Sequence, residues 1–218
     1  INTGYCFLFY GGIMKNVIKR ALVTSLALIM LISMFSCKKN GENESVEPVD
    51  FAAMSDDELK SYAELGEYKL MTLKQGSSPK GEVVWAAVKK NATVRGYPEQ
   101  QVSYYVSQIK AQYAYYAEEA GISYKEMLRE VGATDESIRS EAESMAADDV
   151  IYELVRRDAD ITLRSDEKSK FFEKYVEKYV EDYGYSREYV VENMTDEIYD
   201  SMLYDKTTEF LIAYNYFE

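Results

Sequence analysis

From about residue 80 onward, apolar positions recur every three or four residues. This spacing places apolar side chains on one face of an α-helix. It predicts a short helix over residues 81–91, with Trp85 on its apolar side, and a longer one from about residue 98 to Ala120. The apolar stripe expected to face the core on the longer helix is Val102, Val106, Ile109, Tyr113, Tyr116, Ala117 and Ala120. The pattern therefore predicts a mainly α fold.

Capping signals place the helix boundaries. Ser55 with Glu58, and Ser123 with Glu126, have the spacing of a capping box, in which each side chain satisfies a backbone N–H of the other residue. We expect further helix starts at Thr134, Ser165 and Thr195. The helix from Ser165 carries Phe172, Tyr175, Val176, Tyr179 and Tyr183. A short helix is expected after Ser186, and the last helix, from Thr195, is lined by Tyr199, Leu203, Phe210, Tyr214 and Phe217.

The helix that begins at Thr134 is apolar on two sides. One face carries Ile138, Ala142, Met145 and Tyr152, and the nearly opposite face carries Val150, Ile151, Leu154 and Ile161. A helix on the surface of a domain has a single apolar stripe. This pattern therefore predicts a central helix, held between elements from both ends of the chain.

The segment from Met14 to Cys37 has the features of an export signal. Three basic residues precede an apolar run of 15 residues, Ala21 to Phe35. That run is shorter than the roughly 20 residues that span a bilayer core, as in a cleaved signal peptide. Cys37 comes shortly after this run, and a polar stretch follows it. The segment therefore resembles a bacterial lipoprotein signal, which implies lipidation of Cys37. Two alternatives to a lipoprotein signal remain open: an uncleaved N-terminal anchor, or a cysteine at this position by chance.

These patterns divide the chain into four parts. Residues 1–36 are the predicted signal peptide, and we expect the start of translation at Met14, since residues 1–13 fit no signal pattern. Residues 37–50 are a predicted flexible tether. Residues 51–90 form a short N-terminal arm, in which Glu67 to Leu73 is a candidate strand. Residues 91–218 form the predicted helical domain.

Charge and composition narrow the chemistry. The net charge is −13, and it becomes −16 once residues 1–36, with three basic and no acidic residues, are removed. Such a charge disfavours binding to nucleic acid or to an anionic membrane surface, so the acyl chain on Cys37 would provide the anchor. The chain has no histidine and no other cysteine after residue 36, and it has no phosphate-binding glycine loop. We therefore expect no catalytic residue, cofactor or metal ion.

Five short segments, in order, resemble parts of the C-terminal, substrate-binding domain of trigger factor. They are residues 91–99 (NATVRGYPE), 121–128 (GISYKEML), 131–136 (VGATDE), 159–167 (ADITLRSDE) and 206–213 (KTTEFLIA). The Gly-Phe-Arg signature of ribosome docking is missing, and residues 51–90 are too few for the family's prolyl isomerase domain. The resemblance therefore implies a multi-helix chaperone module without isomerase activity.

Together, the signal and the resemblance imply a lipid-anchored chaperone on the extracytoplasmic face of the cell membrane. It would bind unfolded or partly folded exported polypeptides without ATP. The client-contact candidates are Tyr97, Tyr104 and Tyr115, expected to line up opposite the core stripe of one helix, with Met145 and Tyr152. Alternatively, the stripe of three tyrosines is a second face of the helix that packs against another helix. The alternative function is a structural lipoprotein that binds one dedicated partner or forms a homodimer.

Overall fold

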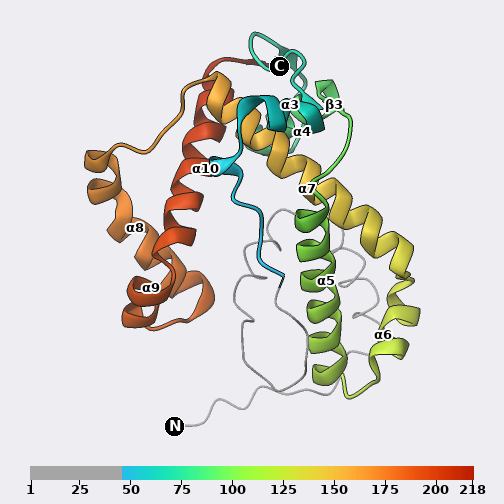
Figure 1. The fold of residues 1–218 in the computed structure, drawn as a ribbon. Helices are drawn as coiled ribbons and strands as arrows, with labels where there is room; N and C mark the ends of the chain where they lie inside the picture. Colours follow the sequence, from blue (N-terminus) through green and yellow to red (C-terminus); the bar gives the residue numbers. More distant parts are fainter. Residues whose placement is uncertain (1–45) are drawn as a thin grey trace. The chain divides into compact units, whose positions relative to one another are not determined.

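The computed structural model describes residues 46–218 (Figure 1). The predicted signal peptide, residues 1–36, and the predicted lipidation site, Cys37, lie outside the described residues. Within residues 46–218, no helix is both long and apolar enough to cross a membrane. The described chain divides into two compact units. The first unit contains residues 46–49 and Glu99–Met145, and the second contains Asp50–Pro98 and Ala146–Glu218.

The described chain is mainly helical, as predicted. Its helices are η1 (Phe51–Ala53, a 3-10 turn), α3 (Asp56–Tyr62), α4 (Lys80–Asn91), α5 (Glu99–Glu119), α6 (Tyr124–Val131), α7 (Asp135–Asp158), α8 (Ser165–Tyr183), α9 (Arg187–Asn193) and α10 (Thr195–Ala213). Its strands are β1 (Ala63–Glu64), β2 (Thr72–Leu73), β3 (Thr93–Val94) and β4 (Tyr216–Phe217).

The first unit is built from α5, α6 and the first half of α7. The buried stripe of α5 runs through Val102, Tyr105, Ile109, Tyr113 and Ala117. The prediction was wrong for Tyr116 and Ala120, which are exposed. A residue of an α-helix lies about 100° around the axis from its neighbour, so Tyr116 is turned away from the face that Ala117 buries.

The local capping predictions in the first unit are confirmed. The Ser123 hydroxyl accepts a hydrogen bond from the Glu126 backbone N–H (3.2 Å), and the Ser123 N–H donates to the Glu126 carboxylate (2.9 Å). Gly132, with φ of 73°, ends α6 in the left-handed conformation that glycine adopts most readily. The Thr134 hydroxyl then accepts from the Ser137 N–H (3.1 Å) at the start of α7.

The end of the predicted tether is fixed to α5 rather than free. The Val49 N–H donates to the side chain of Gln101 (2.8 Å), and the Gln100 side chain donates to the Glu47 carbonyl (3.1 Å). These bonds tie residues 47–49 to the first unit, because two glutamines at the start of α5 supply the acceptor and the donor that the extended backbone needs.

The second unit has a core built around the second half of α7. The buried residues come from α3, β1, α4, α7 and α10, together with the segment before β2. They are Leu59, Ala63, Tyr68, Met71, Val84, Trp85, Val88, Val150, Ile151, Leu154, Val155 and Leu211. Elements from both ends of the described chain therefore enclose this half of α7, as the two apolar faces predicted.

The domain boundary expected at residue 91 does not coincide with a boundary between units. Residues 51–90 share the compact unit of residues 146–218, and α4 packs against α10. The physical reason is apolar burial, because Val84, Trp85 and Val88 of α4 are covered only within that shared core. The predicted N-terminal arm is thus part of a larger body.

Two short sheets complete the second unit. Strands β1 and β3 pair antiparallel, with Ala63 opposite Val94, and β2 and β4 pair parallel, with Thr72 opposite Tyr216. The strand expected over residues 67–73 shrinks to Thr72–Leu73 because Leu70 has a φ of 60°, which interrupts an extended backbone.

The predictions for α8 hold better than those for α10. Val176 and Tyr179 of α8 are buried as expected. The buried positions of α10 are instead Ile198, Ser201, Met202, Thr207 and Leu211, so the predicted stripe lies on the neighbouring face. The caps also shift by one residue, to Arg164 and Met194. Thr195 is instead the first residue of α10, and its hydroxyl donates to the Val191 carbonyl (2.9 Å).

Candidate functional site

Four tyrosines form a continuous row from α8 to α9, which we call the tyrosine ladder: Tyr179, Tyr183, Tyr185 and Tyr189. Successive ring centroids lie 5.4, 6.4 and 5.2 Å apart. Such separations are typical of favourable aromatic pairs. Tyr179 is buried, whereas Tyr189 is 44% exposed. The ladder therefore leads from the interior of the second unit to its surface.

Local sequence signals position the ladder. Tyr179 and Tyr183 are four residues apart and so lie on one face of α8. Gly184, with φ of 72°, ends α8 and lets the chain reverse. The Ser186 hydroxyl then accepts from the Tyr189 N–H (3.2 Å) and caps α9. A turn that needs only a glycine and a serine thus brings two helices together with all four rings in contact.

The inner end of the ladder is anchored to α10. The Tyr179 hydroxyl and the Ser201 hydroxyl share a hydrogen bond of 2.9 Å in a buried setting. Val176 of α8 and Val190 of α9 are fully buried, and both helices pack against α10. The inner rung is therefore held by both packing and a hydrogen bond.

The surroundings of the ladder are acidic. Burial, and after it the Asp182 carboxylate, raise the pKa of Tyr183, while burial and the neighbouring tyrosines raise the pKa of Tyr185. These phenols therefore remain protonated at neutral pH. Arg187 is the sole basic residue in residues 179–197, and it forms an ion pair with Glu173. That segment contains six carboxylates: Glu181, Asp182, Glu188, Glu192, Asp196 and Glu197.

The structure places the predicted client-contact tyrosines in different settings. Tyr97 is exposed but precedes α5 and belongs to the second unit. Tyr104 is half-buried with its ring against Tyr105, and Tyr115 is exposed with its ring against Tyr116, both in the first unit. The three do not line a single helix as expected, because the helix begins only at Glu99.

Met145 and Tyr152 are part of the packed interior. Met145 is buried. Tyr152 lies half-buried in an aromatic cluster, with its ring 6.0 Å from that of Trp85 and 5.8 Å from that of Tyr204. The Trp85 indole N–H donates to the Thr208 hydroxyl (2.8 Å), and burial raises the pKa of Tyr204 to about 12. Neither Met145 nor Tyr152 offers a contact surface to a client in this arrangement.

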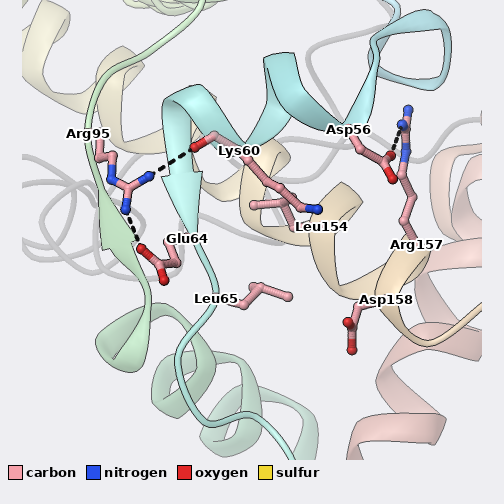
Figure 2. A pocket seen from close by; sticks show the side chains of 8 residues that line it. All are labelled: Asp56, Lys60, Glu64, Leu65, Arg95, Leu154, Arg157 and Asp158. Atoms are coloured by element: carbon pink, nitrogen blue, oxygen red, sulfur yellow. Dashed lines mark hydrogen bonds and ion pairs between the residues drawn. The ribbon is translucent and has the colours of Figure 1, made fainter.

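The second unit also contains a charged hollow of about 530 Å³ (Figure 2). Arg157 pairs with Asp56 on one side (2.7 Å), and Arg95 pairs with Glu64 on the other. The full lining is Asp56, Lys60, Glu64, Leu65, Arg95, Leu154, Arg157 and Asp158. Three basic and three acidic side chains balance one another, so the hollow favours neither an anion nor a cation.

Metal chemistry finds no support in the part of the chain that the structure describes. Residues 46–218 contain no group of three or more histidine, cysteine, aspartate or glutamate side chains placed to hold a metal ion.

The feature that sequence reasoning missed is the outer half of the tyrosine ladder. Its signal is the run YGYSREY over residues 183–189, in which a helix-ending glycine and a capping serine bring three tyrosines close together.

Comparisons with known proteins give no match: no family model matches the chain, no curated protein matches it, and no solved structure matches it. The resemblance to trigger factor accordingly rests on the five short segments quoted above, and the surface features that bear on function lie in the second unit.

Proposed function

We propose that this protein is a lipid-anchored, ATP-independent chaperone that binds unfolded or partly folded exported polypeptides. The observation that carries the proposal is the tyrosine ladder, which brings a solvent-exposed ring, Tyr189, to the end of a row anchored in the core. The segment that resembles a lipoprotein signal, residues 14–37, supports the proposed location.

Tyrosine suits weak capture of many sequences. Its ring offers a large apolar contact area, while its hydroxyl accepts hydration, so an exposed tyrosine tolerates water when no client is present. The six carboxylates of residues 179–197 keep this surface hydrated and disfavour association between copies of the protein. The proposed mechanism is therefore rapid, low-affinity contact with apolar segments of a client, without a chemical step.

Suppression of aggregation tests the proposal. The protein purified after expression of the full chain is mixed, in several-fold molar excess, with a chemically denatured client, and light scattering is followed after dilution. We expect the wild-type protein to suppress scattering and the double variant Tyr185→Ala/Tyr189→Ala to lose more than half of that effect. Val94→Ala, which shortens another exposed apolar side chain of the second unit, is the matched control. An inactive wild-type protein would contradict the proposal.

The alternative is a structural or interaction lipoprotein with one dedicated partner. It is favoured by the small size of the exposed end of the ladder, where Tyr189 and Val191 of α9 are the exposed large apolar side chains. Affinity purification separates the two functions, because a dedicated partner would be recovered stoichiometrically, whereas clients would be many and sub-stoichiometric. Neither function includes catalysis, and measurable turnover in a prolyl isomerisation assay would refute both.

A further inference from the structure

A second surface of the second unit gathers the three most exposed large apolar side chains of the described residues. Leu70 is 67% exposed, Tyr216 is 61% exposed and Tyr214 is 51% exposed. They lie on adjacent backbone segments, since the Leu70 N–H donates to the Tyr214 carbonyl (2.8 Å). We call this surface, together with strand β4, the β4 edge. Apolar side chains that gather in this way mark a binding surface more often than singly exposed ones do.

The backbone at Leu70 is held in an unfavourable conformation. Its φ of 60° lies in the left-handed region, which is unfavourable for a residue with a side chain. The buried Asn215 side chain holds the backbone around Leu70 in place. It accepts a hydrogen bond from the Met71 N–H (2.8 Å) and donates to the carbonyls of Tyr68 (3.0 Å) and Leu211 (2.7 Å). Strain that is maintained at an exposed apolar side chain points to a role for that side chain.

Among the described residues, strand β4 has a neighbouring strand on one side only. The Tyr216 N–H donates to the Met71 carbonyl and the Glu218 N–H to the Leu73 carbonyl, each at 2.9 Å. Successive residues of a strand direct their backbone groups to opposite sides, so the N–H and C=O of Phe217 point away from β2. Within residues 46–218 the sheet has two strands, and α4 packs beside β2, which leaves β4 as the outer strand.

The segment that lies beside strand β4 is basic, in contrast to the chain as a whole, and Glu218 is the carboxylate that directly follows β4. Residues 68–81 contain three lysines and no carboxylate, although the whole chain has a net charge of −13. Lys69 pairs with Asp158. In the described part of the chain, Lys74 and Lys80 have no ion-pair partner, and the Lys80 ammonium lies 5.0 Å from the centre of the Phe217 ring. The β4 edge is therefore complementary to a segment that carries carboxylates.

We propose that the β4 edge binds an extended polypeptide segment in which apolar side chains alternate with carboxylates. The segment adds as a strand beside β4, with Phe217 exchanging backbone hydrogen bonds with it. Its apolar side chains pack on Tyr216 and on the neighbouring exposed Tyr214, and its carboxylates approach Lys74 and Lys80. This site is separate from the tyrosine ladder and does not rest on the chaperone function.

The test uses a fluorescein-labelled heptapeptide of alternating valine and glutamate as the probe. We expect saturable binding to the protein purified from cells expressing the full chain, and slowed hydrogen exchange of the Phe217 amide when the probe is bound. Tyr216→Ala should weaken binding about fivefold, which corresponds to roughly 1 kcal/mol. Lys74→Glu should weaken it as well, and it changes only an exposed side chain, so folding is preserved.

The controls distinguish this site from other surfaces. Lys90→Glu reverses an exposed lysine on α4, and Val94→Ala shortens an exposed apolar side chain of β3; both should leave binding of the probe unchanged. A heptapeptide with lysine in place of glutamate should bind at least about fivefold more weakly. The proposal is overturned if neither peptide binds, if both bind equally, or if the Phe217 amide exchanges at the same rate with and without the probe. It is also overturned if the wild-type protein is a dimer that Tyr216→Ala dissociates, because a second copy would then occupy the edge.

Discussion

Glu153 of α7 is the charged residue that the described part of the chain buries most completely, at 4% exposed. Its carboxylate accepts from the Arg156 guanidinium at 2.7 and 2.5 Å and from Arg157 Nε at 2.6 Å. We predict that Glu153→Ala lowers the free energy of unfolding of the second unit by about 3–5 kcal/mol, the usual cost of removing one partner from a buried ion pair.

The magnitude follows from what the substitution leaves behind. Both arginines are largely covered. Their hydrogen bonds to the Glu153 carboxylate are the main reason that the pKa of each guanidinium is raised. An arginine remains charged, so it cannot neutralise itself when its partner is lost. Arg157 still pairs with Asp56 and donates to the Phe51 carbonyl (2.8 Å), whereas Arg156 keeps only its bond to the Ile161 carbonyl (3.2 Å). We expect Glu153→Gln, which keeps an acceptor oxygen, to cost less than Glu153→Ala.

Urea and thermal unfolding, followed by circular dichroism, measure this effect. A loss of about 3–5 kcal/mol lowers the midpoint of thermal unfolding by roughly 6–20 °C for a chain of this size. Glu173→Ala is the matched control, since it breaks an exposed glutamate–arginine pair of the same unit, and exposed pairs contribute at most about 1 kcal/mol. If Glu153→Ala is no more destabilising than Glu173→Ala, the assignment of a stabilising buried cluster is wrong.

Three further predictions concern other parts of the fold. Gly66→Ala would place a Cβ 2.1 Å from the Asn91 carbonyl oxygen, so it should prevent folding of the second unit or cost several kcal/mol, as measured by urea unfolding. Burial raises the pKa of Glu141, so the folded protein binds this proton more tightly than the unfolded chain does. The folded protein therefore loses stability as the pH rises through the pKa of Glu141. Glu141→Gln should raise the midpoint of thermal unfolding at pH 7, and this gain should vanish in acid. Ser123→Ala breaks the capping box with Glu126 and should cost about 1 kcal/mol, seen as faster amide exchange at the start of α6.

The parts of the fold that the sequence predicts well are those decided by neighbours in the chain. The starts of α3, α6 and α7 depend on a serine or threonine and a residue three positions later, and Gly132 and Gly184 end the helices they follow. Such signals act within one helical turn. The helix start at Thr195 was misplaced by one residue, because a threonine hydroxyl can also bond backward to a carbonyl one turn earlier, as it does here to Val191.

Contacts between distant segments are harder to predict. The pairing of β2 with β4 depends on a buried asparagine, Asn215, that satisfies three backbone groups from residues 68, 71 and 211. An asparagine near the end of a helix is usually interpreted as a cap or a turn residue. The sequence therefore does not indicate that Asn215 joins distant backbone segments. The same difficulty explains why residues 51–90 were expected to form an arm rather than part of a core.

Tyrosine limits the prediction of surfaces for a related reason. Tyr105 and Tyr116 both lie on α5, yet one is buried and the other exposed, and periodicity separates them only when the direction of the core is known. A tyrosine side chain is compatible with either setting, because its ring gains from burial and its hydroxyl gains from water. In the ladder both properties act at once: Tyr179 fills the core and bonds to Ser201, and Tyr189 reaches solvent. The rings between them are therefore restrained from the inside. Truncating Tyr179 should consequently disorder the outer rings as well as weaken the core, whereas truncating Tyr189 should alter the surface alone.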